Sequence, residues 1–297
     1  MKRVIPSCVL AAAAAFTLFV APEGSATADH ISVCSYDASR SRAPLTTGTG
    51  ALSHETLRMA LLNSANFGTG GIVALPVVLE PAITTASTAT LAGCDVFFTS
   101  VFTGATAAEA AAVSAAVNSG MVLITDANSA PAEQGSVTTI LSAFGGGRSV
   151  GPGLECPNSA SGGVVTSTGT PVTNGPFGDI RAGSFSTTPS ASATLGSGDV
   201  SLVTCTGSVR FEIARGALAP ASGLVMVGGD PSAFDLFTNS SSAFYNANNL
   251  TAYLNAFAAA VFQPTGKVDC KKGGWAVFRH PSFKNQGDCI QFVQTGK

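Results

Sequence analysis

The sequence predicts an α/β protein with a flavodoxin-like parallel sheet that carries helices on both faces. Residues 91–128 carry the main observation, because they read as an apolar strand, an alanine-rich helix closed by glycine, and a second apolar strand. Two buried strands joined by a crossover helix form a parallel βαβ unit. Neither strand alternates between apolar and polar residues, which is typical of a sheet covered on both faces.

The elements before this unit fit the same architecture. Residues 29–37 (DHISVCSYD) are expected to form the first strand of the domain. Residues 52–66 have a partly helical apolar spacing, with Ser53 as the expected N-cap. Residues 72–79 are expected to form a strand at a sheet edge, because Pro76 lacks the N–H group that a central strand needs.

The helix of the central unit has a clear start, and the chain that follows it is less regular. Thr106 is expected to cap that helix, with Glu109 at the position that a capping box requires. A helix is expected over residues 136–144. Residues 145–208 are rich in Gly, Ser, Thr and Pro, so we expect a long polar insertion, either β-rich or a functional loop. Alternation over residues 200–213 favours antiparallel strands there.

The last part of the chain divides into the end of the domain and a tail. Residues 223–230 read as an apolar strand that ends in Gly-Gly-Asp, and residues 246–262 read as an amphipathic helix. A Gln-Pro-Thr-Gly break follows that helix. We therefore predict one α/β domain over residues 29–263 and a small module over residues 267–297.

The beginning of the chain has the features of an export signal. Lys2 and Arg3 supply a positive start, residues 9–20 are an apolar core, and the small-x-small signature Ala-Thr-Ala ends at residue 28. Residues 1–28 are therefore expected to be a cleaved signal peptide, which predicts a secreted or periplasmic protein. No later segment is long and apolar enough to suggest a membrane span in the mature chain.

Composition and motifs argue against nucleic-acid binding and against a metal or cofactor site. The formal net charge is −2, only 11% of the residues are charged, and no basic patch is visible, so nucleic acid is not an expected partner. The three histidines are scattered and no CxxC motif occurs. We therefore expect neither a metal site nor a cofactor.

The six cysteines after residue 28 favour disulfides, because their number is even and the chain is exported. Cys270 and Cys289 are expected to pair, since a tail this short cannot bury enough apolar surface to fold without a staple. Cys156 and Cys205 bracket the insertion and are candidates for a second pair. The pairing of the two remaining cysteines, Cys34 and Cys94, stays open.

Polar residues follow several of the predicted strands. Ligands of parallel sheets bind beyond the carboxyl ends of the strands, and Thr99 also lies in this region. Carboxylates there can bind a cation or sugar hydroxyls, or act as acid and base. The other interpretation is that each residue caps a turn or helix, a place that Asp and Asn favour. The candidate ligand-binding residues are Asp37, Ser100, Asp126, Asn128 and Asp230.

Four stretches resemble a known superfamily: LAGCDVFFTS, VNSGMVLITDAN, TPVTNGPFG (residues 170–178) and GLVMVGGD before an Asn-rich helix. Residues 29–262 are similar to the class I glutamine amidotransferase-like proteins, especially their exported, ThuA-like members. The tail, with CKxGGW, SFKNQGDC and IxFV, resembles a short Cys-containing module found at the end of many exported bacterial proteins.

The chain departs from the enzymes of this superfamily at the position of their nucleophile. The resemblance implies a Cys on a glycine-flanked elbow, and the matching position here falls on or beside Asp126 in Ile-Thr-Asp-Ala-Asn. The downstream His of the family would fall near Asp230, where no His occurs. Cys94 stands at the wrong end of its strand to substitute. Thiol catalysis needs a Cys paired with a base, so we expect this chemistry to be absent.

A rival interpretation comes from the D-x-S-x-S pattern formed by Asp37, Ser39 and Ser41. With Asp126 it resembles the Mg²⁺-dependent adhesion site of von Willebrand factor A domains. Against this resemblance, a helix should begin at the motif, and the residues that follow it indicate a loop.

We therefore expect an exported protein with a non-catalytic or carbohydrate-related binding role, and a carbohydrate or a cell-surface component is the candidate partner. The alternative is a hydrolase or isomerase that uses the strand-end carboxylates.

Overall fold

The structure is a computed structural model, and it describes most of the chain. The described residues are 30–45, 54–153, 159–167, 170–187, 191–205, 208–213, 218, 223–228, 246–261, 267, 270, 271, 275 and 283–295. The expected signal peptide, residues 1–28, lies outside this set. In the part of the chain so described, no helix is long and apolar enough to cross a membrane.

A nine-stranded mixed sheet forms the centre of the domain, with the order β2-β1-β3-β4-β13-β12-β11-β6-β9. Its first five strands are parallel: β2 (Val77–Leu79), β1 (Ile31–Ser35), β3 (Val96–Ser100), β4 (Val122–Asp126) and β13 (Val225–Gly228). The remaining strands continue it in antiparallel fashion: β12 (Ser208–Glu212), β11 (Val200–Thr204), β6 (Ser159–Val165) and β9 (Ser184–Thr187). The predicted flavodoxin-like parallel sheet is confirmed.

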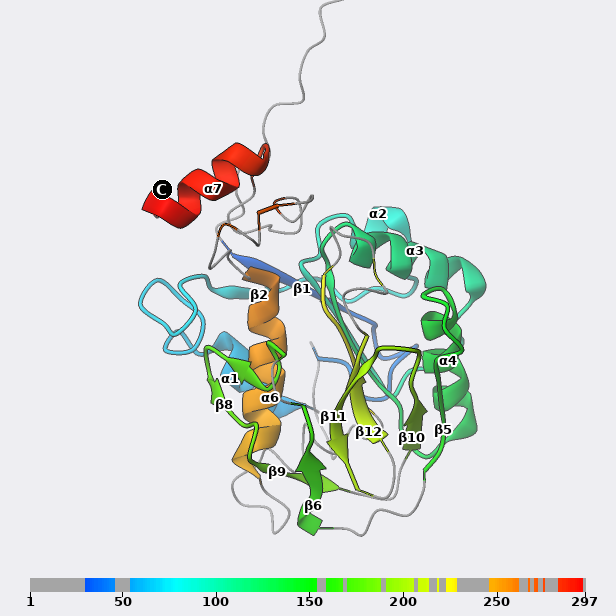
Figure 1. Cartoon of the computed structure of the whole chain (residues 1–297). Helices are drawn as coiled ribbons and strands as arrows, with labels where there is room; N and C mark the ends of the chain where they lie inside the picture. The colour runs from blue at the N-terminus through cyan, green and yellow to red at the C-terminus, as the bar shows by residue number, and fades with distance from the viewer. Residues whose placement is uncertain are drawn as a thin grey trace, which may run out of the picture.

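Helices cover both faces of the parallel strands. Apolar side chains of α1 (Glu55–Leu62) and α6 (Ala247–Ala258) lie in one buried cluster. Those of α2 (Thr88–Leu91), α3 (Ala107–Asn118) and α4 (Pro131–Ser142) lie in a second cluster. In Figure 1, helices α1 and α6 lie on one side of the strands and α3 and α4 on the other. Strand side chains alternate between the two clusters, which is why the strands are apolar throughout. A short 3₁₀ turn, η2 (Ala259–Val261), continues α6.

The predicted insertion is β-rich. Three of its strands, β6, β9 and β11, join the central sheet. Two small antiparallel sheets account for the rest: β5 (Ser149–Pro152) pairs with β10 (Ala191–Thr194), and β7 (Asn174–Gly175) with β8 (Gly178–Asp179). The antiparallel strands predicted over residues 200–213 are confirmed as β11 and β12.

Some of the predicted helix and strand starts are confirmed, and others are wrong. The Thr106–Glu109 capping box is present, and β2 lies at the sheet edge after Pro76, as predicted. The N-cap of α1 is His54, with φ +48° and no side-chain capping bond, and not the expected Ser53. Helix α4 starts five residues before the predicted start, because proline is well tolerated in the first turn, where its missing N–H is not needed.

Two disulfides are described in full. Cys34 in β1 bonds to Cys94 just before β3, with Cα atoms 5.7 Å apart, which settles the pairing that the sequence left open. The predicted Cys270–Cys289 disulfide is present and joins Cys270 to helix α7 (Gln286–Thr295), which contains Cys289. Four partly buried residues pack against it: Trp275, Phe283, Ile290 and Val293. Cys205 also stands in a disulfide, and its expected partner, Cys156, lies outside the described residues.

Candidate functional site

The carboxyl ends of the central strands carry a row of polar residues on the face that α1 and α6 cover. Ser100 of β3 pairs with Asp126 of β4, which pairs with Gly228 of β13, which in turn pairs with Arg210 of β12. Because these positions are in register on neighbouring strands, their side chains project on the same face. The side chains of Ser100, Asp126 and Arg210 are at most 2% exposed.

Tyr253 of α6 connects the two charged members of this row. Its hydroxyl donates to Asp126 Oδ1 at 3.3 Å and accepts from Arg210 Nε at 3.2 Å. The Arg210 guanidinium also lies 5.0 Å from the ring centroid of Phe185, which favours a buried cation. The network therefore joins a carboxylate and a guanidinium through a phenol, away from solvent.

Gly228 is required by this arrangement. A Cβ atom built there would stand 1.7 Å from Asp126 Oδ1 and 3.4 Å from Tyr253 Oη. The absence of a side chain at this position therefore gives the Asp126 carboxylate the space to lie over the neighbouring strand.

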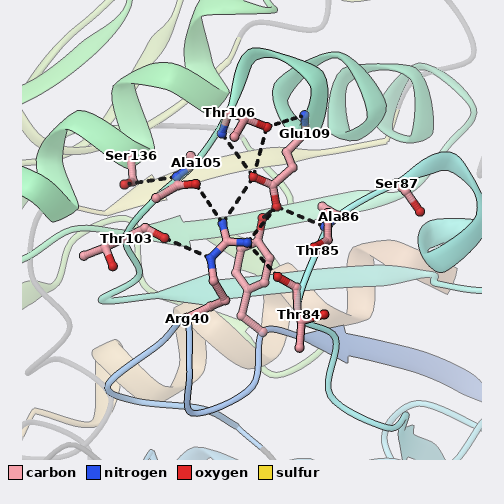
Figure 2. A network of polar contacts seen from close by, with 12 residues as sticks. Arg40, Thr84, Thr85, Ala86, Ser87, Thr103, Ala105, Thr106, Glu109 and Ser136 are labelled. Atoms are coloured by element: carbon pink, nitrogen blue, oxygen red, sulfur yellow. Dashed lines mark hydrogen bonds and ion pairs between the residues drawn. The ribbon is translucent and has the colours of Figure 1, made fainter.

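The opposite face, covered by α2 and α3, is closed by an ion pair between Arg40 and Glu109 (Figure 2). Arg40 uses all five of its N–H donors. Two reach the Glu109 oxygens at 3.0 and 3.2 Å, and the others reach the carbonyl oxygens of Thr84, Thr103 and Gly104. This guanidinium has no donor left for a ligand, so its role is to hold together the loops that follow β1, β2 and β3.

Glu109 is equally well satisfied. Its carboxylate accepts from the Tyr36 hydroxyl at 3.1 Å and from the backbone N–H groups of Ala86 and Thr106. Burial alone would raise the pKa of Glu109, but the hydrogen bonds from Arg40 and from these backbone groups hold it below its usual value. Burial, together with the Glu109 charge, raises the pKa of Tyr36.

Two of the predicted rim residues take part in local turns. Asp37 accepts from the hydroxyl and the N–H of Ser39 at 2.6 and 2.9 Å, and the hydroxyl bond lowers its pKa. Asn128 accepts from the N–H of Ser129 through its Oδ1 atom. Both side chains are partly exposed. The fifth candidate, Asp230, lies outside the described residues.

The D-x-S-x-S residues do not converge with Asp126 in the contacts described. Ser41 donates its hydroxyl to the carbonyl of Ser100 at 2.5 Å, and Asp126 contacts Tyr253 instead. Among the residues that the structure describes, no group of three or more His, Cys, Asp or Glu side chains is arranged to hold a metal ion.

Sequence reasoning missed Arg210, Tyr253 and His54. Arg210 could have been noticed as a charged residue in the alternating stretch Ser-Val-Arg-Phe-Glu, on the inward side. Tyr253 stands among apolar positions of an amphipathic helix and looks like ordinary core. His54 is fully buried with its ring edge-on to Phe98 at 5.4 Å, and burial lowers its pKa to about 3. No local signal distinguished it.

No family model matches the sequence, and no curated protein matches it. Among solved structures, the N-terminal domain of mmIFT52 is 12% identical, with a TM-score of 0.46, over 72% of this chain and 92% of that one. A ThuA-like protein from Bacteroides uniformis is 15% identical, with a TM-score of 0.44, over 81% of this chain and 95% of that one. At TM-scores this low, these similarities identify neither a family nor a function.

Proposed function

We propose that this chain is an exported, non-catalytic binding protein that takes a carbohydrate ligand at the carboxyl ends of its parallel strands. One observation carries the non-catalytic part. The position at which the glutamine amidotransferase-like resemblance implies a nucleophilic thiol falls on or beside Asp126, which is 0% exposed and accepts a hydrogen bond from the Tyr253 hydroxyl.

A thiol mechanism has no support at this position. Nucleophilic catalysis by Cys needs a thiolate within reach of a base and of the substrate. Cys94 is 0% exposed and oxidised in a disulfide with Cys34, so it supplies no thiolate.

A hydrolase built on strand-end carboxylates is also less favoured. General acid–base catalysis requires the carboxyl group to come within hydrogen-bond distance of the substrate. Asp126 is buried beneath α6, whereas Asp37 is partly exposed and already accepts two hydrogen bonds from Ser39. The two carboxylates therefore have different surroundings, and neither is placed as the partner of the other.

Export is supported by the oxidised cysteines. Disulfides persist in oxidising compartments, and the described residues include the pairs Cys34–Cys94 and Cys270–Cys289. We expect N-terminal sequencing of the secreted protein to start at or within a residue or two of Asp29. A mature protein that keeps residues 1–28 contradicts this proposal.

The carbohydrate part is supported by the chemistry of the rim. Asp37 and Asn128 are partly exposed, and Ser39 and Ser129 beside them are exposed. Carboxylate, amide and hydroxyl groups can both accept hydrogen bonds from sugar hydroxyls and, through the amide and hydroxyls, donate to them. These residues follow β1 and β4, at the edge of the sheet where ligands of this fold class bind.

Calorimetric titration of the secreted protein with neutral mono- and oligosaccharides tests this proposal. We expect saturable binding that Asn128→Ala and Asp37→Ala weaken at least tenfold. Asp179→Ala is the matched control, because Asp179 is an exposed aspartate that likewise accepts from the residue two positions later. Release of ammonia from glutamine by the wild-type protein contradicts the non-catalytic assignment, and the absence of binding to every sugar contradicts the carbohydrate assignment.

A further inference from the structure

Residues 41–45, which we call the strap, cross the carboxyl end of β3. Ser41 forms an antiparallel bridge with Phe102, just beyond the strand, and its hydroxyl donates to the carbonyl of Ser100. At its far end, Leu45 is 0% exposed and belongs to the apolar cluster on the α1 and α6 face. The strap therefore lies directly over Ser100.

Two buried hydroxyls on this face of the sheet have no partner among the described residues. The Oγ atoms of Ser35 and Ser100 make no hydrogen bond, and Ser35 of β1 pairs in register with Phe98, two residues before Ser100 on the same face of β3. Buried polar atoms in native proteins nearly always have a protein or water partner. β1 and β3 are neighbours in the sheet. The chain runs from β1 to β2 on one side and from β3 to β4 on the other, so the boundary between β1 and β3 is the switch point at which open α/β sheets bind ligands.

The backbone beneath the strap is strained. Val101 has φ +48°, a region that a β-branched residue rarely adopts, and its carbonyl accepts from the N–H of Arg42 in the strap at 3.2 Å. Strain of this kind persists only where the surroundings impose it, and it concentrates at ligand clamps and switch regions. The closed strap thus covers Val101, whose backbone is strained, and Ser100, whose hydroxyl has no partner.

The two arginines at the start of the strap, Arg40 just before it and Arg42 within it, are held unequally. Just before it, Arg40 is fixed by its five donated hydrogen bonds to Glu109 and three carbonyl oxygens. Within it, the Arg42 side chain is 58% exposed and bonds a single oxygen, Oε1 of Glu133, whose Oε2 is buried without a partner. Arg42 is the exposed residue of the strap, whereas Ser41, Ala43, Pro44 and Leu45 are buried. Its contact with Glu133 is therefore the attachment of the strap that solvent reaches.

We propose that the strap is a flap that opens at Arg42 and uncovers a site for a hydroxyl-rich ligand, formed by the hydroxyls of Ser35 and Ser100. A serine hydroxyl both donates and accepts hydrogen bonds, which matches the mixed donor and acceptor character of a sugar. This inference rests on the proposed carbohydrate function and assigns its ligand to the α1 and α6 face of the sheet. The other face is closed by the Arg40–Glu109 ion pair, in which every N–H donor of Arg40 is already in use.

Thiol labelling of the folded protein tests the flap. In Ser100→Cys, methyl methanethiosulfonate should react at least tenfold faster than in the matched control Thr125→Cys, whose site is 0% exposed on the opposite face of the neighbouring strand. Adding Arg42→Ala to Ser100→Cys should accelerate labelling by at least a further threefold. The described cysteines are in disulfides and do not compete. Equal labelling of the two single variants overturns the proposal.

Hydrogen exchange in the wild-type protein gives a readout that needs no substitution. The N–H groups of Arg42 and Thr103, which bond the carbonyls of Val101 and Arg40, should exchange at least tenfold faster than those of β4. Exchange as slow as that of β4 overturns the flap.

The ligand is tested separately with whichever sugar binds in calorimetry. Its addition should slow the labelling of Ser100→Cys at least fivefold. A sugar that binds without slowing the labelling overturns this site and leaves the proposed function standing. Fast labelling with no sugar bound contradicts the carbohydrate function and supports the flap.

Discussion

The hydroxyl of Tyr253 lies 3.3 Å from Oδ1 of Asp126, a hydrogen bond between residues 127 positions apart. It ties helix α6 to the end of the central strand β4, and through Arg210 it extends to β12. Asp126 is thus part of a buried polar network.

Tyr253→Phe should destabilise the fold by about 1–3 kcal/mol, because Asp126 and Arg210 both lose a buried hydrogen-bond partner. Urea unfolding followed by circular dichroism measures the change. Ser142→Ala is the control, since its hydroxyl makes an exposed bond to the carbonyl of Thr139, and we expect a change within about 0.5 kcal/mol. Equal effects of the two variants would show that the phenol contributes nothing.

Gly228→Ala should cost about 1–3 kcal/mol, because the new Cβ would collide with Asp126 Oδ1 and move the carboxylate from the position at which it accepts from Tyr253. Gly135→Ala is the matched control. Gly135 lies inside α4, and a Cβ atom added there would meet nothing within 4 Å, so alanine should stabilise the helix by up to about 1 kcal/mol. Thermal unfolding of both variants distinguishes a close approach from the general cost of replacing glycine.

Arg40→Lys should destabilise the protein by about 3 kcal/mol, because a lysine ammonium cannot reproduce the five donors that bind Glu109 and three carbonyls. Arg181→Lys is the control at an exposed pair with Asp179, where we expect at most about 0.5 kcal/mol. Chemical unfolding at pH 7 measures the loss of stability in both variants. A loss at Arg40 no larger than that at Arg181 would show that Arg40 does not hold the three loops together.

Acid should weaken the fold through His54. Burial lowers the pKa of this imidazole to about 3 from its ordinary value of 6.5. The unfolded chain therefore binds a proton below pH 6.5 that the folded chain does not accept until about pH 3. The contribution of His54 to the free energy of unfolding is fully present well above pH 6.5. It falls as the pH drops toward 3, by at most about 1.4 kcal/mol per pH unit.

His54→Asn tests this effect, because asparagine does not titrate and tolerates the positive φ of this position. Unfolding free energies of wild type and variant between pH 7 and pH 4.5 should diverge, with the wild type losing more as the pH falls. Parallel curves contradict the burial of a neutral imidazole.

Local patterns were sufficient for much of the architecture. The apolar strands around the alanine-rich helix, the Thr106–Glu109 capping box and the edge position of the strand after Pro76 all follow from residues within a few positions of one another. The same patterns placed Asp126 at the end of a central strand. Such features depend on backbone period and on hydrogen bonds within a single turn, so one stretch of sequence contains them.

Contacts between distant segments decided the rest. The Cys34–Cys94 pairing, the Arg40–Glu109 lock and the Asp126–Tyr253–Arg210 network join residues between 43 and 127 positions apart. Each depends on which strands are neighbours and on which face a helix lies. The burial of Asp126 is a consequence of that packing, because only the position of α6 over the strand ends brings Tyr253 to its carboxylate.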